Sequence, residues 1–408
     1  MSRAWRSTLI ATAIALSACQ SGPPSTPEAN ILIGSDLPIS GFFGDAPPAM
    51  QAIQLAVEQH PMIGRFRLGY LSLDDAVAGV ATPEKGIQNV SQMIDDSRVL
   101  GVIGPWVSYL ARDEIPETNQ VPLAMISSST TNSCLTRSVP ACYDRAGKLR
   151  PTGSNNFFRI APPDLVQGAA MADYLTRTLH NSRVAAINEW GDDGALYLDS
   201  FATELARDGG QLVFSQQINP GATQFGGFLA EASRRGAQVI YALGDADSQI
   251  CVVRLQMSPD LLFAGTDGFT NTTACIKQAG GNANGMVGTL GDVDATLSGS
   301  PAAMKAVRDY HRRFPRTNMH GFSTFGTYDC ALILIDAMQR AVDANNGGIP
   351  TRRQVLDALA QTKGFVGATG TYTFKSSGDA TAPLMTIYKV VDGKWAFQSQ
   401  VDLSSAQG

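Results

Sequence analysis

Residues 122–136 read Pro-Leu-Ala-Met-Ile-Ser-Ser-Ser-Thr-Thr-Asn-Ser-Cys-Leu-Thr, a short apolar run that ends in a run of hydroxyl side chains. The apolar part predicts a buried strand. The same arrangement recurs at Gly34-Ser35-Asp36 and at residues 104–108, Gly-Pro-Trp-Val-Ser, which also follow short apolar runs. In open parallel sheets, ligands bind beyond the carboxyl ends of the strands. These stretches therefore predict a parallel sheet and the edge at which it binds a ligand.

Around this stretch, apolar strand patterns alternate with helical ones, and the alternation starts again after a Ser/Thr/Pro/Gly-rich segment at 127–156. Alternating strands and helices imply parallel sheets covered by helices on both faces. We therefore expect an α/β fold with two doubly wound lobes. Asp392-Gly393, between two strand patterns, predicts a β-hairpin. Strands are expected at residues 31–34, 66–73, 99–103, 122–126, 184–187, 212–214, 239–243 and 261–264.

The composition excludes several classes of function. The 408 residues carry a net charge of −5, and no Lys/Arg cluster alternates with aromatic residues. Nucleic acid is therefore not an expected partner. The four histidines are scattered, and no metal-binding spacing, nucleophile elbow, Walker loop or dinucleotide fingerprint is present. We expect no catalytic residue, no metal and no cofactor, and so not an enzyme.

The N-terminus has the pattern of an export signal. Arg3 and Arg6 precede an apolar run at 9–16, which is shorter than the roughly 20 residues that span a bilayer. Leu-Ser-Ala-Cys at 16–19 resembles the lipobox of bacterial lipoproteins, which implies removal of residues 1–18 and lipidation of Cys19. Residues 19–29 then form the lipidated cysteine and a flexible, Pro/Ser-rich tether. The alternative is an ordinary signal peptide with an incidental cysteine. We expect a periplasmic or extracytoplasmic protein that is lipid-anchored to a bacterial membrane.

The cysteines fit such a compartment, because disulfides form in oxidising environments. Without Cys19, five cysteines remain, so at least one thiol is left over. Cys330, in an apolar helical pattern, is the expected buried thiol. The expected disulfides join Cys134 to Cys142, beside the hydroxyl-rich stretch, and Cys251 to Cys275.

The polar groups at the strand ends differ between the two halves. The first half offers hydroxyls and helix-start N–H groups, which suit an anion such as a carboxylate. The second half offers carboxylates, which suit an ammonium group. A zwitterion between the lobes would use both sets. The alternative for each residue is a helix cap, and Trp106 and Phe43 are either walls of the site or packed aromatics. The carboxylates of the second half are Asp192, Asp193, Asp245, Asp247 and Asp267.

From about Asn30 onward, several stretches in a characteristic order resemble the type I periplasmic binding proteins, in particular the leucine/isoleucine/valine-binding family of ABC-transporter receptors. The resemblance implies two lobes joined by a three-crossing hinge, a solute that closes them, a permease that reads the closed form, and a monomer. It places the first lobe at 30–158 plus 290–366 and the second at 159–289 plus 367–403. The stretches are Ile39-Ser40-Gly41 with Phe43-Gly44-Asp45, Leu100 to Gly104, residues 122–136, Phe158-Arg159 with Gln167-Gly168, residues 263–271 (FAGTDGFTN) and Thr327-Tyr328-Asp329.

The resemblance also implies roles for single residues. It matches Ser108 and the loop residues Ser129, Thr130 and Thr131 to the family's ligand-binding positions. Phe43 matches an aromatic position that is often tyrosine, and Asp267 matches the acidic residue that pairs with the ligand's ammonium.

Two departures bear on the kind of ligand. Family tyrosines of the second lobe fall near Asp193 and Asp245, and the loop that contains Ser108 is shorter by about two residues than usual. Carboxylates in place of an apolar wall favour an amine, an amide or a basic amino acid over a leucine-like side chain. The expected function is therefore an extracytoplasmic solute-binding lipoprotein of an ABC transporter, for an amino acid or related solute. The alternative is an outer-membrane lipoprotein of the same fold that regulates a cell-wall synthase, since fold does not fix function.

Overall fold

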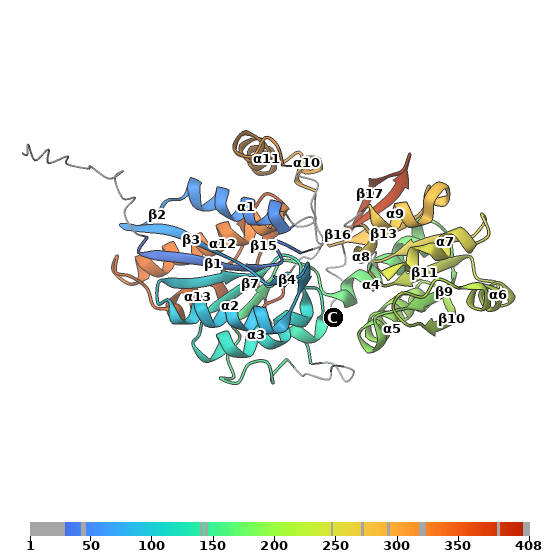
Figure 1. Ribbon diagram of the computed structural model, residues 1–408, viewed down its shortest axis with the longest axis horizontal. Coiled ribbons are helices and arrows are strands. Elements are labelled where there is room, and N and C mark those ends of the chain that lie inside the picture. The colour runs from blue at the N-terminus through green and yellow to red at the C-terminus, as the bar shows by residue number, and fades with distance from the viewer. Residues whose placement is uncertain are drawn as a thin grey trace, which may run out of the picture.

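The computed structural model contains two lobes, each built on one sheet with helices on both faces (Figure 1). This arrangement confirms the predicted α/β class. The residues that the structure describes are 29–41, 46–138, 142, 146–245, 248–270, 273–291, 294–317, 324–381 and 384–402.

The first lobe carries a sheet of order β2-β3-β1-β6-β7-β8, in which only the β2–β3 pair is antiparallel. Successive side chains of a strand point to opposite faces. In β1, Ile31 and Ile33 therefore pack in the core shared with α1, α12 and α13, and Leu32 packs in the core shared with α2 and α3. The strands are β1 (Ile31–Leu37), β2 (Met62–Ile63), β3 (Phe66–Asp74), β6 (Val99–Ile103), β7 (Ala124–Ser127) and β8 (Phe157–Arg159), and the helices are α1 (Ala46–Gln59), α2 (Pro83–Asp95), α3 (Ser108–Gln120), α12 (Thr324–Ala344) and α13 (Arg352–Ala360).

The second lobe carries a sheet of order β10-β9-β11-β12-β13-β16-β17, parallel from β10 to β13 and antiparallel at the last two pairs. Helices α4 and α5 cover one face, and α6 to α9 cover the other. The strands are β9 (Arg183–Asn188), β10 (Gln211–Gln217), β11 (Val239–Leu243), β12 (Leu262–Gly265), β13 (Val287–Leu290), β16 (Leu384–Val391) and β17 (Lys394–Asp402), and the helices are α4 (Asp164–Asp173), α5 (Gly191–Arg207), α6 (Gly226–Arg234), α7 (Val253–Gln256), α8 (Asp267–Thr270) and α9 (Ala274–Ala279).

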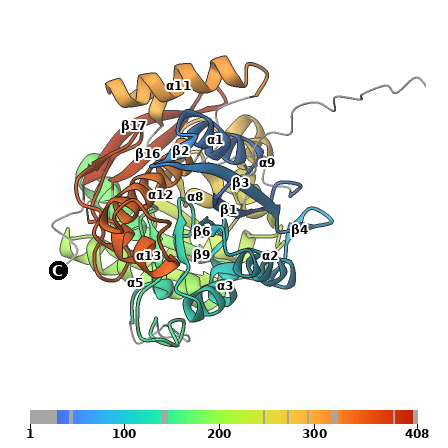
Figure 2. The same cartoon turned by 90° about the vertical axis from the view of Figure 1, so that its left-hand side faces the viewer.

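The predicted hairpin joins β16 and β17 through Asp392 and Gly393, whose φ angles are +49° and +72°. Positive φ at both central residues is what the favoured two-residue hairpin turn requires. The remaining elements are short, apart from α11, which lies next to α1 in both views (Figures 1 and 2). They are β4 (Ala76–Val77), β5 (Val80–Ala81), 3-10 turns at Ser133–Leu135, Ile250–Val252 and Gly280–Asn282, a π-helical turn at Tyr174–Thr178, α10 (Ala295–Ser298), α11 (Pro301–Arg313), β14 (Phe365–Val366) and β15 (Thr371–Tyr372).

The chain passes between the lobes three times: after β8, after β13 and before β16. The resemblance predicts that the second lobe resumes at residue 367, but the packing places this change after Thr381. Ala368, Tyr372, Phe374 and Ala380 belong to the apolar core of the first lobe. Asp329 of α12 holds this segment, because its carboxylate accepts hydrogen bonds from the N–H groups of Ala368 (2.7 Å) and Thr369 (2.8 Å).

Both predicted disulfides are present, and Cys330 is a buried free thiol, as expected. Cys134–Cys142 spans eight residues of the first lobe, and Cys251–Cys275 spans 24 residues of the second. Bridges of this kind typically contribute about 2–4 kcal/mol. None of the described helices has both the length and the apolar character needed to cross a membrane.

Candidate functional site

On the first-lobe side, the loops that follow β6 and β7 are tied together by hydrogen bonds. The Ser108 hydroxyl, in the first turn of α3, accepts hydrogen bonds from the backbone N–H groups of Thr131 and Asn132, both at 3.2 Å. The Ser129 hydroxyl donates to the backbone carbonyl of Trp106, which is itself buried. The structure thus brings together the predicted residues Trp106, Ser108, Ser129 and Thr131 at the carboxyl ends of two neighbouring strands.

A buried ion pair contacts the loop that follows β7. Arg159 at the end of β8 is fully buried, donates to the Thr130 carbonyl (3.2 Å) and binds the Asp379 carboxylate (2.8 Å). Burial alone would raise the pKa of Asp379, but Arg159, with Thr136 and Arg137, lowers it to about 2. Sequence reasoning missed this pair, because 220 residues separate its members.

Gly34-Ser35-Asp36 does not lie at a strand end as expected. Strand β1 runs on to Leu37, and Ser35 and Asp36 are fully buried within the lobe. Phe43, Asp247 and Cys19 lie outside the residues that the structure describes.

On the second-lobe side, two carboxyl groups lie close together. Asp267 is the first residue of α8, and its backbone N–H donates to the Gln167 side-chain oxygen (2.8 Å). Asp164 is the first residue of α4, and its backbone N–H donates to the Thr131 carbonyl of the first lobe (2.8 Å). Asp164 therefore lies where the lobes meet, as does α4 in Figure 1. Sequence reasoning did not select it, since an acidic residue at a helix start is ordinarily explained by the helix dipole.

Burial raises the pKa values of both carboxyl groups. Burial, followed by the negative charge of Asp267, raises the pKa of Asp164 to about 7, although Thr131 and Arg159 partly offset this rise. Burial also raises the pKa of Asp267, while Gln167 and two backbone N–H groups act in the opposite direction. No Lys, Arg or His among the described residues forms an ion pair with either of them. A cation brought from outside would therefore remove an unfavourable accumulation of negative charge.

Asp193 and Asp245, the departures from the family pattern, have partners within the chain. Asp193 in the first turn of α5 forms an ion pair with Arg112 of α3 at 2.8 Å, which links the two lobes. Asp245 accepts a hydrogen bond from the Trp190 indole N–H at 3.1 Å. Their direct contact with a ligand stays a prediction.

A second group of acids lies inside the first lobe, between β1, α2 and α3. Asp36, Asp75 and Glu114 are fully buried, and five of their six carboxyl oxygens have no donor among the described residues. The sixth oxygen accepts a hydrogen bond from the Asn89 amide (2.6 Å).

Burial raises the pKa of all three acids. Asp36 shifts to about 6, although Glu114 and Asn89 pull its pKa down, and Glu114 shifts well above its usual value, helped by the charge of Asp36. Asp75 shifts to about 8, raised further by the charges of Asp36 and Asp74. These acids are closed to any solute, so we call them the buried acid cluster and exclude them from the binding site.

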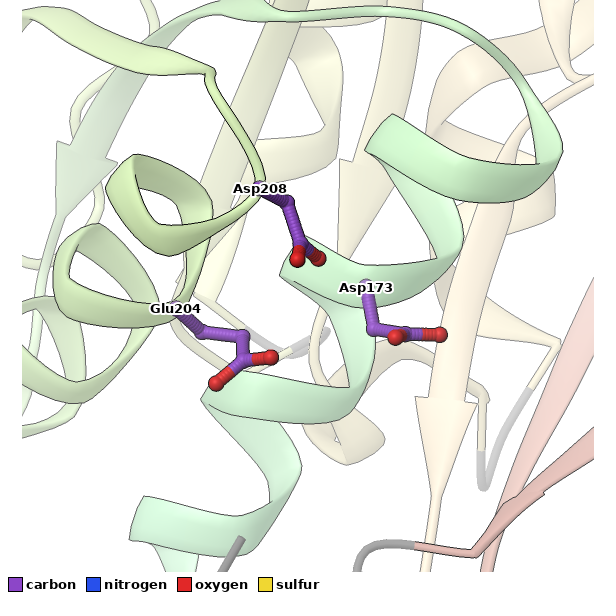
Figure 3. Close-up of side chains that lie close together, drawn as sticks. All are labelled: Asp173, Glu204 and Asp208. Atoms are coloured by element: carbon purple, nitrogen blue, oxygen red, sulfur yellow. The ribbon is translucent and has the colours of Figure 1, made fainter.

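A third acidic group lies at the end of α4, on α5 and directly after α5; its members are Asp173, Glu204 and Asp208 (Figure 3). Their ligand atoms are close enough to hold a metal ion, but arginines already compensate them. Arg177 pairs with Asp208 (2.6 Å) and Asp173 (3.1 Å), and Arg207 pairs with Glu204. These acids lie near the C-terminal ends of α4 and α5, whereas Asp164 and Asp193 lie at the N-terminal ends. They are therefore not part of the site between the lobes.

A cavity of about 740 Å³ lies within the first lobe and not at the junction. Its lining includes Gln59 and His60 at the end of α1, Lys305 and Asp309 of α11, and Tyr328 of α12. None of the predicted site residues contributes to it.

Comparisons with known proteins agree with the fold. Residues 30–394 match a family described as periplasmic binding protein. The "Leu/Ile/Val-binding protein homolog 3" of Brucella melitensis biotype 1 is 26% identical over 383 residues, which cover 91% of this chain and 95% of that protein. The leucine-binding protein LivK of Thermotoga maritima superposes with a TM-score of 0.74 at 21% identity, covering 92% of this chain and 99% of that chain. LivJ of Streptococcus pneumoniae, solved with isoleucine, gives 0.73 at 19% identity, covering 91% and 99%.

The family match runs from the start of β1 to the start of β17, and therefore includes both lobes and all three crossings. The solved relatives show the same two-lobe fold over nearly their whole length. The resemblance noted in the sequence is thereby confirmed: the chain belongs to the periplasmic binding protein family and has its type I fold.

Proposed function

We propose that this protein is an extracytoplasmic solute-binding lipoprotein of an ABC transporter, and that it binds an amino acid or a related amine- or amide-bearing solute between its lobes. The observation that carries the proposal is the pair Asp164 and Asp267. These carboxyl groups lie at the junction with raised pKa values and without an ion-pair partner in the described chain. An ammonium group is the charge they lack.

The first-lobe loops supply the complementary chemistry. Ser108 is the first residue of α3, and the loop after β7 contains Ser129, Thr130 and Thr131. Hydroxyl groups and N–H groups at a helix start bind carboxylates. In this proposal they hold the solute's carboxylate, Asp267 holds its ammonium, and Trp106 and Phe43 form walls. Relatives named or solved as leucine, isoleucine or valine binders support an amino acid as the solute.

The nature of the solute's side chain follows from the second lobe. Asp193 and Asp245 fall near positions at which the family has tyrosines, so we expect a polar or basic side chain to fit this site better than leucine, with Arg112 already pairing with Asp193. A permease would read the closed form, and the protein would act as a monomer.

The test is a thermal-shift screen of the purified mature protein, followed by calorimetry. Each amino acid is compared with its N-acetyl derivative and its amide, which remove the ammonium and the carboxylate in turn. A bound solute at a hundredfold excess over its Kd should stabilise the protein by about 2.7 kcal/mol. One group of free amines should respond, and its N-acetyl forms should not. If no solute responds and the protein instead captures a cell-wall synthase, the regulator alternative replaces this proposal.

The membrane anchor has its own test. Cys19→Ala should release the protein from the membrane fraction, because the acyl chains attach to this residue. Ser21→Ala, two residues along the tether, is the matched control and should stay with the membrane. Retention of the Cys19→Ala protein in the membrane fraction would contradict lipidation at Cys19.

A further inference from the structure

Helix α11 carries a row of exposed cations on the outside of the first lobe (Figure 2). Residues three and seven positions apart lie on one face of a helix, and Lys305, Arg308 and Arg312 have this spacing. The side chains of Lys305 and Arg312 are 64% and 77% exposed, and Arg308 is exposed as well. The buried face of the same helix consists of Ala303, Ala306 and Tyr310. The cations are therefore turned away from the core.

Two contacts place the last turns of α11 at the C-terminal end of α1. Arg313 pairs with Glu58 at 2.8 Å, and the Gln59 side-chain amide donates to Asp309 at 3.0 Å. Helix α1 connects β1 to its parallel neighbour β3, so it runs back across the sheet. Its C-terminal end therefore lies on the side of the amino ends of the strands, opposite to the proposed binding site.

The chain between α1 and β3 adds two arginines and reaches the point at which the N-terminal segment enters the lobe. Strand β2 pairs with the start of β3, and Arg65 is exposed in the turn between them. The Arg67 backbone N–H donates to the Asn30 side-chain oxygen (3.1 Å), and the Asn30 N–H donates to the Arg67 carbonyl (3.0 Å). Asn30 directly precedes β1, so the N-terminal segment joins the lobe beside these arginines. We call the following six residues the basic face: Arg65, Arg67, Lys305, Arg308, Arg312 and Arg316.

The basic face is positively charged on a chain whose net charge is −5. Asp309 pairs with Lys305 (2.8 Å) and with Arg312 (3.4 Å). The other four cations form no ion pair within the part of the chain that the structure describes. Two exposed apolar side chains, Met62 and Met304, lie on the same elements. Clustered cations with a few exposed apolar side chains fit a negatively charged lipid surface.

The N-terminal tether determines which side of the molecule lies near the membrane. Cys19 precedes Ala29, the first described residue, by ten positions, and a segment of this length spans at most about 36 Å. A lipid at Cys19 therefore holds the amino ends of the first-lobe strands within this distance of the bilayer. The basic face lies beside those strand ends, so it is within reach of the lipid headgroups.

We propose that the basic face docks on the anionic phosphate headgroups of the membrane that holds the Cys19 lipid. The inference rests on the lipid anchor of the proposed function, and it adds a second, electrostatic contact to that anchor. Docking through the amino ends of the first-lobe strands turns their carboxyl ends away from the bilayer. The junction between the lobes then stays open to an arriving solute.

The experiment measures co-sedimentation of the mature chain carrying Cys19→Ala with lipid vesicles. Vesicles of phosphatidylglycerol and phosphatidylethanolamine supply anionic phosphates, and vesicles of phosphatidylcholine supply a surface without net charge. The protein should sediment with the first kind at low ionic strength and not with the second. Salt at about 1 M, where the Debye length is about 3 Å, should release it. Absence of binding to the anionic vesicles at low ionic strength would overturn the proposal.

Charge variants in the same background identify the face that binds. Arg308→Gln, Arg312→Gln and Arg316→Gln together should weaken binding by about a hundredfold, because each cation close to an anionic membrane contributes about fivefold. The matched control removes three exposed cations of the second lobe and should bind nearly as before; its changes are Arg234→Gln, Lys277→Gln and Lys394→Gln.

Two results with these variants would contradict the proposal. Equal losses in both triple variants would show that overall charge, and not this face, determines binding. Normal vesicle binding by the α11 variant together with failed solute uptake in cells would assign the face to a protein partner. Because the tested protein carries neither lipid nor solute, the outcome is independent of the lipidation test and of the amino-acid screen.

Discussion

Two groups of acids in the molecule carry negative charge that no ion pair among the described residues neutralises: the buried acid cluster of the first lobe and the Asp164–Asp267 pair at the junction. They differ in what can neutralise that charge. In both, burial and neighbouring negative charge raise carboxyl pKa values, and in neither does a described lysine or arginine form an ion pair. The cluster is fully buried, so only protons can neutralise it. The pair lies where the lobes meet, so a solute can supply the charge. What distinguishes a binding site from a structural group of acids is therefore whether a solute can reach the carboxyl groups, more than how far their pKa values are raised.

The largest expected effect comes from removing the charge of Asp267 from the pair. Asp267→Asn keeps the shape of the side chain and most hydrogen bonds of the turn but removes the charge. Affinity for the amine solute found in the screen should fall by about 2–5 kcal/mol, the usual cost of breaking a buried charge pair. Calorimetry measures this loss. Asp260→Asn, in the turn before β12, is a control that should leave affinity unchanged. Unaltered binding by folded Asp267→Asn protein would remove Asp267 from the site.

The next effect concerns the buried acid cluster, and it should appear in stability and not in binding. The folded chain keeps the Asp75 carboxyl protonated up to about pH 8, whereas the unfolded chain releases that proton near its ordinary pKa of 3.8. Since the folded state binds more protons in this interval, stability falls as pH rises from about 4 to about 8. Asp36 and Glu114 act in the same direction, Asp74 and Asp113 add negative charge nearby, and Lys85 opposes them.

Asp75→Asn removes the cost of neutralising that carboxyl. The free energy of unfolding at pH 8 should rise by about 1–3 kcal/mol, and its decline with pH should become shallower. Urea titrations at pH 5 and pH 8 measure both. Asp95→Asn is the matched control, because Asp95 is an exposed residue at the end of α2 and lies outside the buried acid cluster. A loss of stability at pH 8 in Asp75→Asn would show that a carboxylate is needed there.

A third expected effect is that the affinity for the solute depends on pH. The pKa of Asp164 is raised to about 7, so a cationic solute should bind more tightly as pH rises towards 7.5 and this group ionises. The gain is at most about tenfold per pH unit below the pKa. Calorimetry in two buffers of different ionisation enthalpy should detect proton release on binding near pH 6.5. Asp164→Asn should abolish the release, and a flat pH profile in the wild-type protein would contradict the model of an ammonium bound to this pair.

The smallest effect is expected at Asp193, the acid of the junction that already has a cation. Its ion pair with Arg112 is partly exposed, with 44% and 34% of the two side chains accessible. Such pairs are worth about 0.2–1 kcal/mol. Arg112→Ala and Asp193→Asn should therefore weaken solute binding by less than about fivefold, and less still at high salt. If Asp193→Asn costs as much as Asp267→Asn while Arg112→Ala costs little, Asp193 contacts the solute directly.

Much of the fold could be predicted from the sequence, because apolar runs such as Val99–Ile103 and Ala124–Ser127 are buried strands of a parallel sheet. The turn at Asp392 and the small loop closed by Cys134 and Cys142 also followed from local sequence, and the second expected disulfide, Cys251–Cys275, is present as well. The division of the last segment between the lobes did not, since β14 and β15 have two residues each and leave no periodic pattern.

The site was predictable only in part, for a related reason. Ser108 and Thr131 follow apolar strands and could be selected by position alone. Asp164 becomes distinctive only when the crossing after β8 brings it against Thr131, and Asp193 only when the lobes bring it against Arg112. Asp36 shows the converse: a polar residue after an apolar run can also be a buried residue within the strand. Pairings between lobes depend on their relative placement, which no local pattern encodes.

The position of α4 has a consequence for the order of events in solute capture. This helix starts directly after the first crossing, so Asp164 and Gln167 lie near the axis about which the lobes would rotate. A point near a pivot travels less than a point at the rim for the same rotation. If the protein binds an amine as proposed, the acidic part of the site would keep nearly the same geometry in an open and a closed molecule, and an arriving ammonium would dock before the lobes swing together. The association rate would then be set by diffusion of the solute to the preformed acidic pair. Closure of the lobes would determine the residence time of the solute.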